Sequence, residues 1–121
     1  MSHLRRKVNN ARVSWHAVVS LWHEEFSFRL QAIFGIIVIG ASFVLNISHI
    51  EFLIVLLMIG TVLAVEALNT AIEELCDHVT PEEHPKIGKI KDLGSGASLL
   101  IGIAAIIVGL IIFIPHLLLV P

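Results

Sequence analysis

The chain has few of the residues that build ordinary soluble proteins. Tyrosine is absent, Cys76 is the one cysteine, and charged residues make up only 15% of the 121 residues. A single cysteine excludes an internal disulfide. Hydrophobic residues make up 56% and the mean hydropathy is +0.90, which excludes an ordinary soluble domain. The composition therefore predicts one small integral membrane domain covering residues 1–121.

Three apolar stretches are long enough to cross a bilayer, which takes about 20 residues. We place these spans at about residues 30–48, 52–76 and 93–120. Residues 5–28 carry charges, but apolar side chains recur there at spacings of three and four: Ala11, Trp15, Val18, Val19, Trp22 and Phe26. This pattern is typical of an amphipathic helix in the membrane interface. The predicted fold is all-α, an N-terminal amphipathic surface helix followed by three transmembrane helices.

The positive charges predict an orientation. All eight Lys and Arg residues precede the first span or lie between the second and third spans: Arg5, Arg6, Lys7, Arg12, Arg29, Lys86, Lys89 and Lys91. Positive charge favours the cytoplasmic side of a membrane. We therefore expect a multi-pass membrane protein, with its amino terminus on the cytoplasmic side and its carboxyl terminus outside.

The second span carries a polar face. Glu66, Asn69 and Glu73 fall within roughly 60° of one another on a helix. Glu66 lies roughly 20 Å down this span from its outer end, and Glu73 lies near the cytoplasmic interface, level with Glu25 and Asp92. Ionisable groups at membrane depth are costly and usually mark a pathway, a relay or a catalytic site. A hydrogen-bonded seam between helices, without chemistry, is the alternative.

Small residues repeat at helical spacing on two spans. One stripe contains Ser95, Ser98, Gly102, Ala105 and Gly109, and the other contains Gly60, Ala64, Ala67 and Ala71. Such stripes allow membrane helices to approach closely. Three short spans are also too few to cover their own polar groups, so we expect a homo-oligomeric bundle.

Carboxylates, an amide and a lysine at one interface suit Mg²⁺, which prefers oxygen ligands and often shares them with nucleotide phosphates. A metal-free carboxylate could accept a proton from an alcohol. The sequence has no Gly-x-x-x-x-Gly-Lys-Ser/Thr loop and no protein-kinase signature, and we expect no nucleic-acid partner. The residues alone thus leave two functions open: metal-assisted chemistry, or an ion or proton relay through Glu66 and Glu73. A relay would need a polar route outward from Glu66, where residues 52–65 offer only Thr61.

Three motifs carry a resemblance to a known family. The second span contains Glu66-Ala67-Leu68-Asn69-Thr70-Ala71-Ile72-Glu73. A second motif, Lys91-Asp92-Leu93-Gly94-Ser95, leads into the third span, and the surface helix contains Ser14-Trp15 through Trp22, Glu25, Phe28 and Arg29. In this order they resemble the small prokaryotic diacylglycerol kinases, a family that includes the undecaprenol kinases. The resemblance implies that the membrane is the bacterial cytoplasmic membrane. The resemblance spans nearly the whole chain.

The resemblance implies a homotrimeric lipid kinase that moves the γ-phosphoryl group of MgATP to the primary hydroxyl of a membrane lipid. It implies that Glu66 is the base and that Asn69 positions groups beside it. Glu25 and Glu73 would hold the Mg²⁺ that bridges the ATP phosphates, and Ser95 would lie near the lipid headgroup. The remaining nucleotide contacts would come from Arg6, Glu82, Glu83, His84, Lys91 and Asp92.

The sequence departs from the family pattern at two positions. Gln31 stands where relatives often carry an acid or a histidine, and Val13 replaces an aromatic residue that some members place against the nucleotide. The turn at residues 81–85 resembles the undecaprenol kinases, whereas Leu93-Gly94-Ser95 resembles the diacylglycerol kinases. Both lipids therefore stay open as the substrate.

Overall fold

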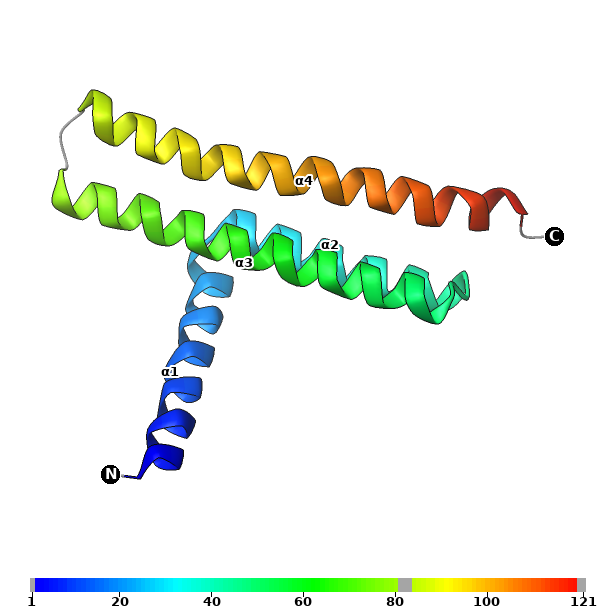
Figure 1. The fold of residues 1–121 in the computed structure, drawn as a ribbon, viewed down its shortest axis with the longest axis horizontal. Helices are drawn as coiled ribbons and strands as arrows, with labels where there is room; N and C mark the ends of the chain where they lie inside the picture. Colours follow the sequence, from blue (N-terminus) through cyan, green and yellow to red (C-terminus); the bar gives the residue numbers. More distant parts are fainter. Residues whose placement is uncertain (1, 81–83, 120–121) are drawn as a thin grey trace.

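The computed structural model describes residues 2–80 and 84–119. These residues form four helices: α1 (His3–Glu24), α2 (Phe26–Val44), α3 (His49–Val79) and α4 (Pro85–Leu119). Helices α2 and α4 each pack on α3, and each runs antiparallel to it, whereas α1 leaves the bundle at a steep angle (Figure 1). The prediction of an all-α fold is confirmed.

Three of these helices are long and apolar enough to cross a membrane: Phe26–Val44, His49–Val79 and Pro85–Leu118. This confirms the three expected membrane-length helices. The expected surface segment, residues 5–28, comprises most of α1 and the first turn of α2. No residue of α1 is buried, and its place in the membrane interface stays a prediction.

A polar contact fixes the junction between α1 and α2. Glu25 lies between the two helices in extended backbone, with φ −111°. The Arg29 guanidinium donates to the carbonyl oxygens of Trp22 at 2.9 Å and of His23 at 3.3 Å. The last carbonyls of a helix have no partner within it and carry a partial negative charge. Arg29 therefore satisfies the end of α1 and holds Glu25 where the chain changes direction.

A capping box begins α3. The Ser48 hydroxyl accepts from the Glu51 backbone N–H at 3.1 Å, and the Glu51 carboxylate accepts from the Ser48 backbone N–H at 2.9 Å. This reciprocal pair satisfies two N–H groups that the helix itself leaves free. The same carboxylate lies 3.5 Å from His116 Nε2 on α4. The start of α3 is thus tied to the end of α4.

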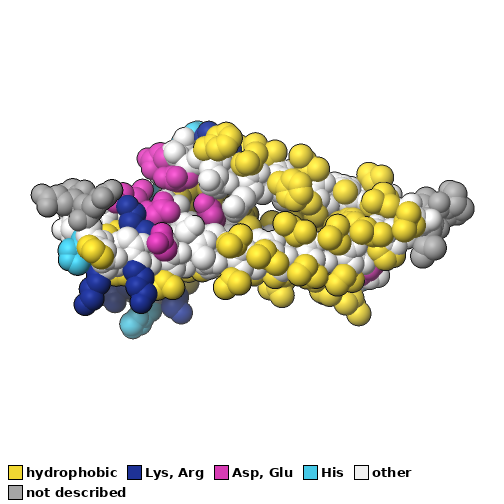
Figure 2. Space-filling view, turned by 90° about the horizontal axis from the view of Figure 1, so that it is seen from above, with side chains coloured by type: hydrophobic (Ala, Val, Ile, Leu, Met, Phe, Trp, Pro, Cys, Tyr) yellow, Lys and Arg dark blue, Asp and Glu magenta, His cyan; other side chains and the backbone are white. Residues whose placement is uncertain are grey.

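Charge is segregated along the bundle. Acidic and basic side chains gather at the end where α3 finishes and α4 begins, while most of the visible surface beyond it is hydrophobic (Figure 2). Large apolar side chains of α2, α3 and α4 are widely exposed in the single chain. Exposed apolar area of this extent is typical of surfaces that face lipid or other protein. The polar end is where the candidate site lies.

Candidate active site

The Glu66 carboxylate is half-buried on α3 and has partners on both neighbouring helices. Gln31 Nε2 on α2 donates to Glu66 Oε2 at 3.5 Å, and Ser98 Oγ on α4 donates to the same oxygen at 3.3 Å. Because an ionised carboxylate only accepts hydrogen bonds, an amide and a hydroxyl are matching donors. The structure therefore places this acid at the meeting point of three helices.

Asn69 and Glu73 form the next turns of the same face. Asn69 is buried, and its Nδ2 donates to Glu73 Oε1 at 3.2 Å. The Asn69 side-chain oxygen is also buried and has no hydrogen-bond partner among the described residues. It lies directly against Gly94 of α4, where any Cβ would collide with it. Gly94 thus allows α4 to approach α3 at the site.

Of the residues expected on α4, one faces α3 and two are exposed. Lys91 faces α3 and forms an ion pair with Asp77, and both side chains are partly exposed. Asp92 and Ser95 are exposed. Ser98, one helical turn beyond Ser95, is the serine that contacts Glu66. The face of α4 that packs on α3 at the site therefore carries Lys91, Gly94 and Ser98.

The other expected residues lie on α1, at the α1–α2 junction, at the start of α4, or outside the described residues. Glu25 is half-buried at the α1–α2 junction, and Arg6 is exposed near the free end of α1 (Figure 1). His84 Nδ1 accepts from the Lys86 backbone N–H at 3.2 Å, so its ring caps the start of α4. Glu82 and Glu83 lie outside the described residues. A single chain therefore does not bring Arg6 to Glu66.

The donor chemistry of Glu25 and Glu73 fits a hard cation. Both residues are half-buried and supply carboxylate oxygen atoms. Residues 2–80 and 84–119 hold no group of three or more His, Cys, Asp or Glu side chains that could bind a metal by themselves. Mg²⁺ in nucleotide sites usually takes one or two carboxylates and completes its shell with phosphates and water. The residues fit that arrangement, in which phosphate supplies the missing ligands.

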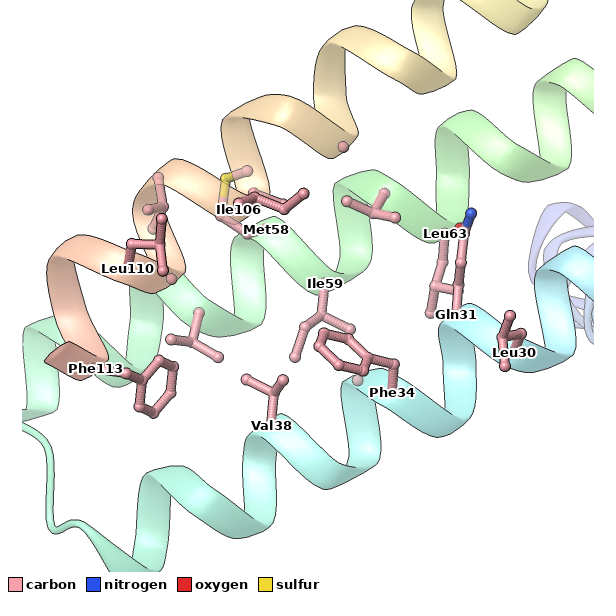
Figure 3. Close-up of a pocket in the computed structure, with 17 residues that line it drawn as sticks. Leu30, Gln31, Phe34, Val38, Met58, Ile59, Leu63, Ile106, Leu110 and Phe113 are labelled. Atoms are coloured by element: carbon pink, nitrogen blue, oxygen red, sulfur yellow. The ribbon is translucent and has the colours of Figure 1, made fainter. Parts of the chain in front are cut away.

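An apolar groove leads to this polar cluster. It has a volume of about 750 Å³ and is lined by α2, α3 and α4. Gln31 is the one polar side chain among its described lining residues and lies toward one end, while Phe113 lies toward the other (Figure 3). Gly102, Ala105 and Gly109 of the predicted small-residue stripe line it as well. The apolar groove therefore reaches Gln31, whose amide contacts Glu66.

Residues 12–113 match the family model described as prokaryotic diacylglycerol kinase. The chain belongs to this family. It is 35% identical to the undecaprenol kinase of Bacillus subtilis over 105 residues, covering 84% of this chain and 85% of the relative. It is 30% identical to the diacylglycerol kinase of Escherichia coli strain K12, covering 92% and 91%. A third relative, the diacylglycerol kinase of Synechocystis, is 34% identical over 88% of this chain, which spans 62% of that protein.

As a lipid kinase of the prokaryotic diacylglycerol kinase family, the protein is a membrane enzyme with a nucleotide and a lipid as substrates. Sequence reasoning missed two of the residues that surround its central acid. Ser98 was interpreted only as part of a packing stripe, and Gln31 only as a departure from the family. Both are polar residues within apolar stretches, and that local contrast was the available signal.

Proposed function

We propose that this protein transfers the γ-phosphoryl group of MgATP to the primary hydroxyl of a membrane lipid alcohol. The observation that carries the proposal is Glu66: a half-buried carboxylate on a membrane-length helix, hydrogen-bonded by Gln31 at the polar end of an apolar groove. A lipid chain lying in the groove would present its hydroxyl near this carboxylate. Undecaprenol and diacylglycerol, which the relatives' names give, both have such a hydroxyl.

In the proposed reaction, Glu66 accepts the proton of the lipid hydroxyl as the hydroxyl oxygen attacks the γ-phosphorus. The bond from that phosphorus to the bridging oxygen of ADP breaks, and ADP leaves. Phosphoryl transfer depends mainly on positioning and on neutralising the phosphate charge. A Mg²⁺ ion bound with the nucleotide would supply part of that neutralisation. Glu73 and Glu25 would hold the ion, Asn69 would orient Glu73, and Lys91 and Asp92 would contact the nucleotide.

The remaining assignments follow the same proposal. Arg6, Glu82, Glu83 and His84 would contact the nucleotide, and Ser95 would lie near the lipid headgroup. Because Arg6 lies near the far end of α1 from the bundle, its contact would come from a neighbouring copy, which agrees with a homotrimer. The amino terminus and the α3–α4 connection would face the cytoplasm, where ATP is present.

A proton or ion relay through Glu66 receives less support. Thr61, the one polar residue among residues 52–65 of α3, donates its hydroxyl hydrogen to the Leu57 carbonyl at 2.7 Å within its own helix. The groove beyond Gln31 is apolar along its described lining. A lipid substrate suits an apolar groove, whereas a moving proton needs a chain of polar groups.

The test is phosphorylation by purified protein in phospholipid nanodiscs, with ATP labelled at the γ-phosphorus, Mg²⁺, and undecaprenol or diacylglycerol as acceptor. We expect one labelled lipid product, and a fall of about 10²-fold or more in turnover for Glu66→Gln, the size typical of a lost general base. Glu74→Gln, which changes an exposed acid on the same helix, should keep normal turnover. A polar seam without chemistry would tolerate Glu66→Gln, so full activity of that variant would refute the proposed base.

A further inference from the structure

Both hydrogen bonds to the Glu66 carboxylate end on the same oxygen. Gln31 Nε2 lies 3.5 Å from Oε2 and Ser98 Oγ lies 3.3 Å from it. Within residues 2–80 and 84–119, Oε1 accepts no hydrogen bond. The two donors come from different helices, α2 and α4, so they constrain the carboxylate from two sides. This leaves one oxygen held and the other free.

We propose that Gln31 and Ser98 are positioning residues, which hold Glu66 by Oε2 so that Oε1 receives the proton of the lipid hydroxyl. The inference rests on the proposed function, because it assigns the roles of the two oxygens of the proposed base. A carboxylate with one oxygen engaged by two donors has a restricted rotation about its terminal bond. Catalysis gains from this because a base must be correctly oriented when the proton moves.

The chemical types of the two donors support this assignment. Amide and hydroxyl groups are neutral and donate to an ionised carboxylate, and neither competes with the substrate as a proton donor at neutral pH. The Gln31 side-chain oxygen is buried without a hydrogen-bond partner among the described residues. Burying an unpaired amide oxygen costs free energy, and the contact of Nε2 with Glu66 is the interaction that the amide retains there.

The position of Gln31 connects this arrangement to the substrate. Gln31 lines the apolar groove and also contacts the base. A lipid chain in the groove would therefore pass the residue that orients Glu66. Ser98 approaches from α4, on the face that also carries Gly94 against Asn69. Helices α2 and α4 together set the direction of a carboxylate that belongs to α3.

The test compares kcat, KM for ATP and KM for the lipid in Ser98→Ala, Gln31→Met and their double variant. The two hydrogen bonds are long, so we expect each single variant to lose about three- to tenfold in kcat with little change in KM for ATP. The double variant should lose more. Ser98→Thr keeps a hydroxyl and should restore most of the kcat. Ser42→Ala removes a serine hydroxyl that bonds only its own helix, at the Val38 carbonyl, and should behave as the parent.

Three results would overturn the inference. They are normal kcat in both single variants, a change in KM for ATP or lipid with no change in kcat, and a kcat for Ser98→Thr as low as that of Ser98→Ala. Size-exclusion chromatography in detergent and circular dichroism identify variants that fail to fold. If Ser98→Ala is among them, the kcat of Ser98→Thr is compared with that of the parent instead. Glu66→Gln separates the two proposals. If it is inactive while Ser98→Ala and Gln31→Met turn over normally, only the assignment of the two oxygens is wrong. If Glu66→Gln is active, the proposed base itself is wrong.

Discussion

The contact between Gly94 and Asn69 gives a quantitative test of how closely α4 must approach α3. A Cβ at position 94 would collide with the Asn69 side-chain oxygen and lie 3.5 Å from Asn69 Cγ and 3.7 Å from Ile72 Cδ1. Gly96, two residues later on α4, has nothing within 4 Å of an added Cβ. Gly94→Ala and Gly96→Ala therefore make the same chemical change on one helix with and without the clash.

Two contributions to the stability of Gly94→Ala are of similar size and opposite sign: the higher helix propensity of alanine and the cost of overpacking. Alanine is favoured over glycine in a helix by about 1 kcal/mol, and this gain applies at both positions. Overpacking at position 94 costs about 1–3 kcal/mol, so Gly94→Ala should be less stable than Gly96→Ala by that amount. Relief of the clash requires Asn69 to move, which would lengthen its 3.2 Å hydrogen bond to Glu73. A hydrogen bond to a charged group contributes about 1.5–3 kcal/mol.

We therefore expect Gly94→Ala to lose about 10- to 100-fold in kcat if the Asn69–Glu73 bond is needed in the transition state. Gly96→Ala should keep the parent kcat. Stability is measured by SDS-induced unfolding in mixed micelles, and activity by the nanodisc assay. Equal stability and equal kcat for the two alanine variants would refute the close approach of α4 to Asn69.

Two further predictions concern the groove and the ion pair. Gly102→Leu places a side chain in the groove and should raise KM for the lipid several-fold without changing KM for ATP. The control is Gly40→Leu, which changes an exposed glycine outside the groove. Equal lipid KM values for the two variants would contradict a lipid chain in the groove. Asp77→Asn removes the ion-pair partner of Lys91 and should lower KM for ATP by up to about fivefold, since ATP binding would no longer have to break this weak, solvent-screened pair. A higher KM for ATP would instead mean that Asp77 orients Lys91 for the nucleotide.

The helices were predictable because their signals are local. Apolar length indicated the three membrane-length helices, and the spacing of Glu66, Asn69 and Glu73 indicated one polar face, because residues three and seven apart share a face on any helix. The motifs indicated the family that the comparisons confirm. These properties depend on the chain's own periodicity and composition.

The contacts between helices were not predictable in this way. Whether Ser95 or Ser98 meets Glu66 depends on how α4 is rotated about its axis, and a rotation of about 60° exchanges such residues. The ion pair of Lys91 with Asp77 and the hydrogen bond of Arg29 to the end of α1 also depend on how side chains extend from one helix to another. Metal binding, trimer formation and the roles of Glu82 and Glu83 stay predictions.

The capping box at Ser48 has a consequence for the depth of Glu66 in the membrane. It fixes the start of α3, and Glu66 lies about 26 Å along this helix from His49 at about 1.5 Å per residue. The hydrocarbon layer of a typical bilayer is about 30 Å thick, and membranes differ from this value by a few ångströms. Because α3 has a constant length, a thinner or thicker bilayer changes the distance between the Glu66 carboxylate and the headgroups of the opposite leaflet. Helix length and membrane thickness together thus set how far a lipid hydroxyl must move to reach Glu66, the proposed base.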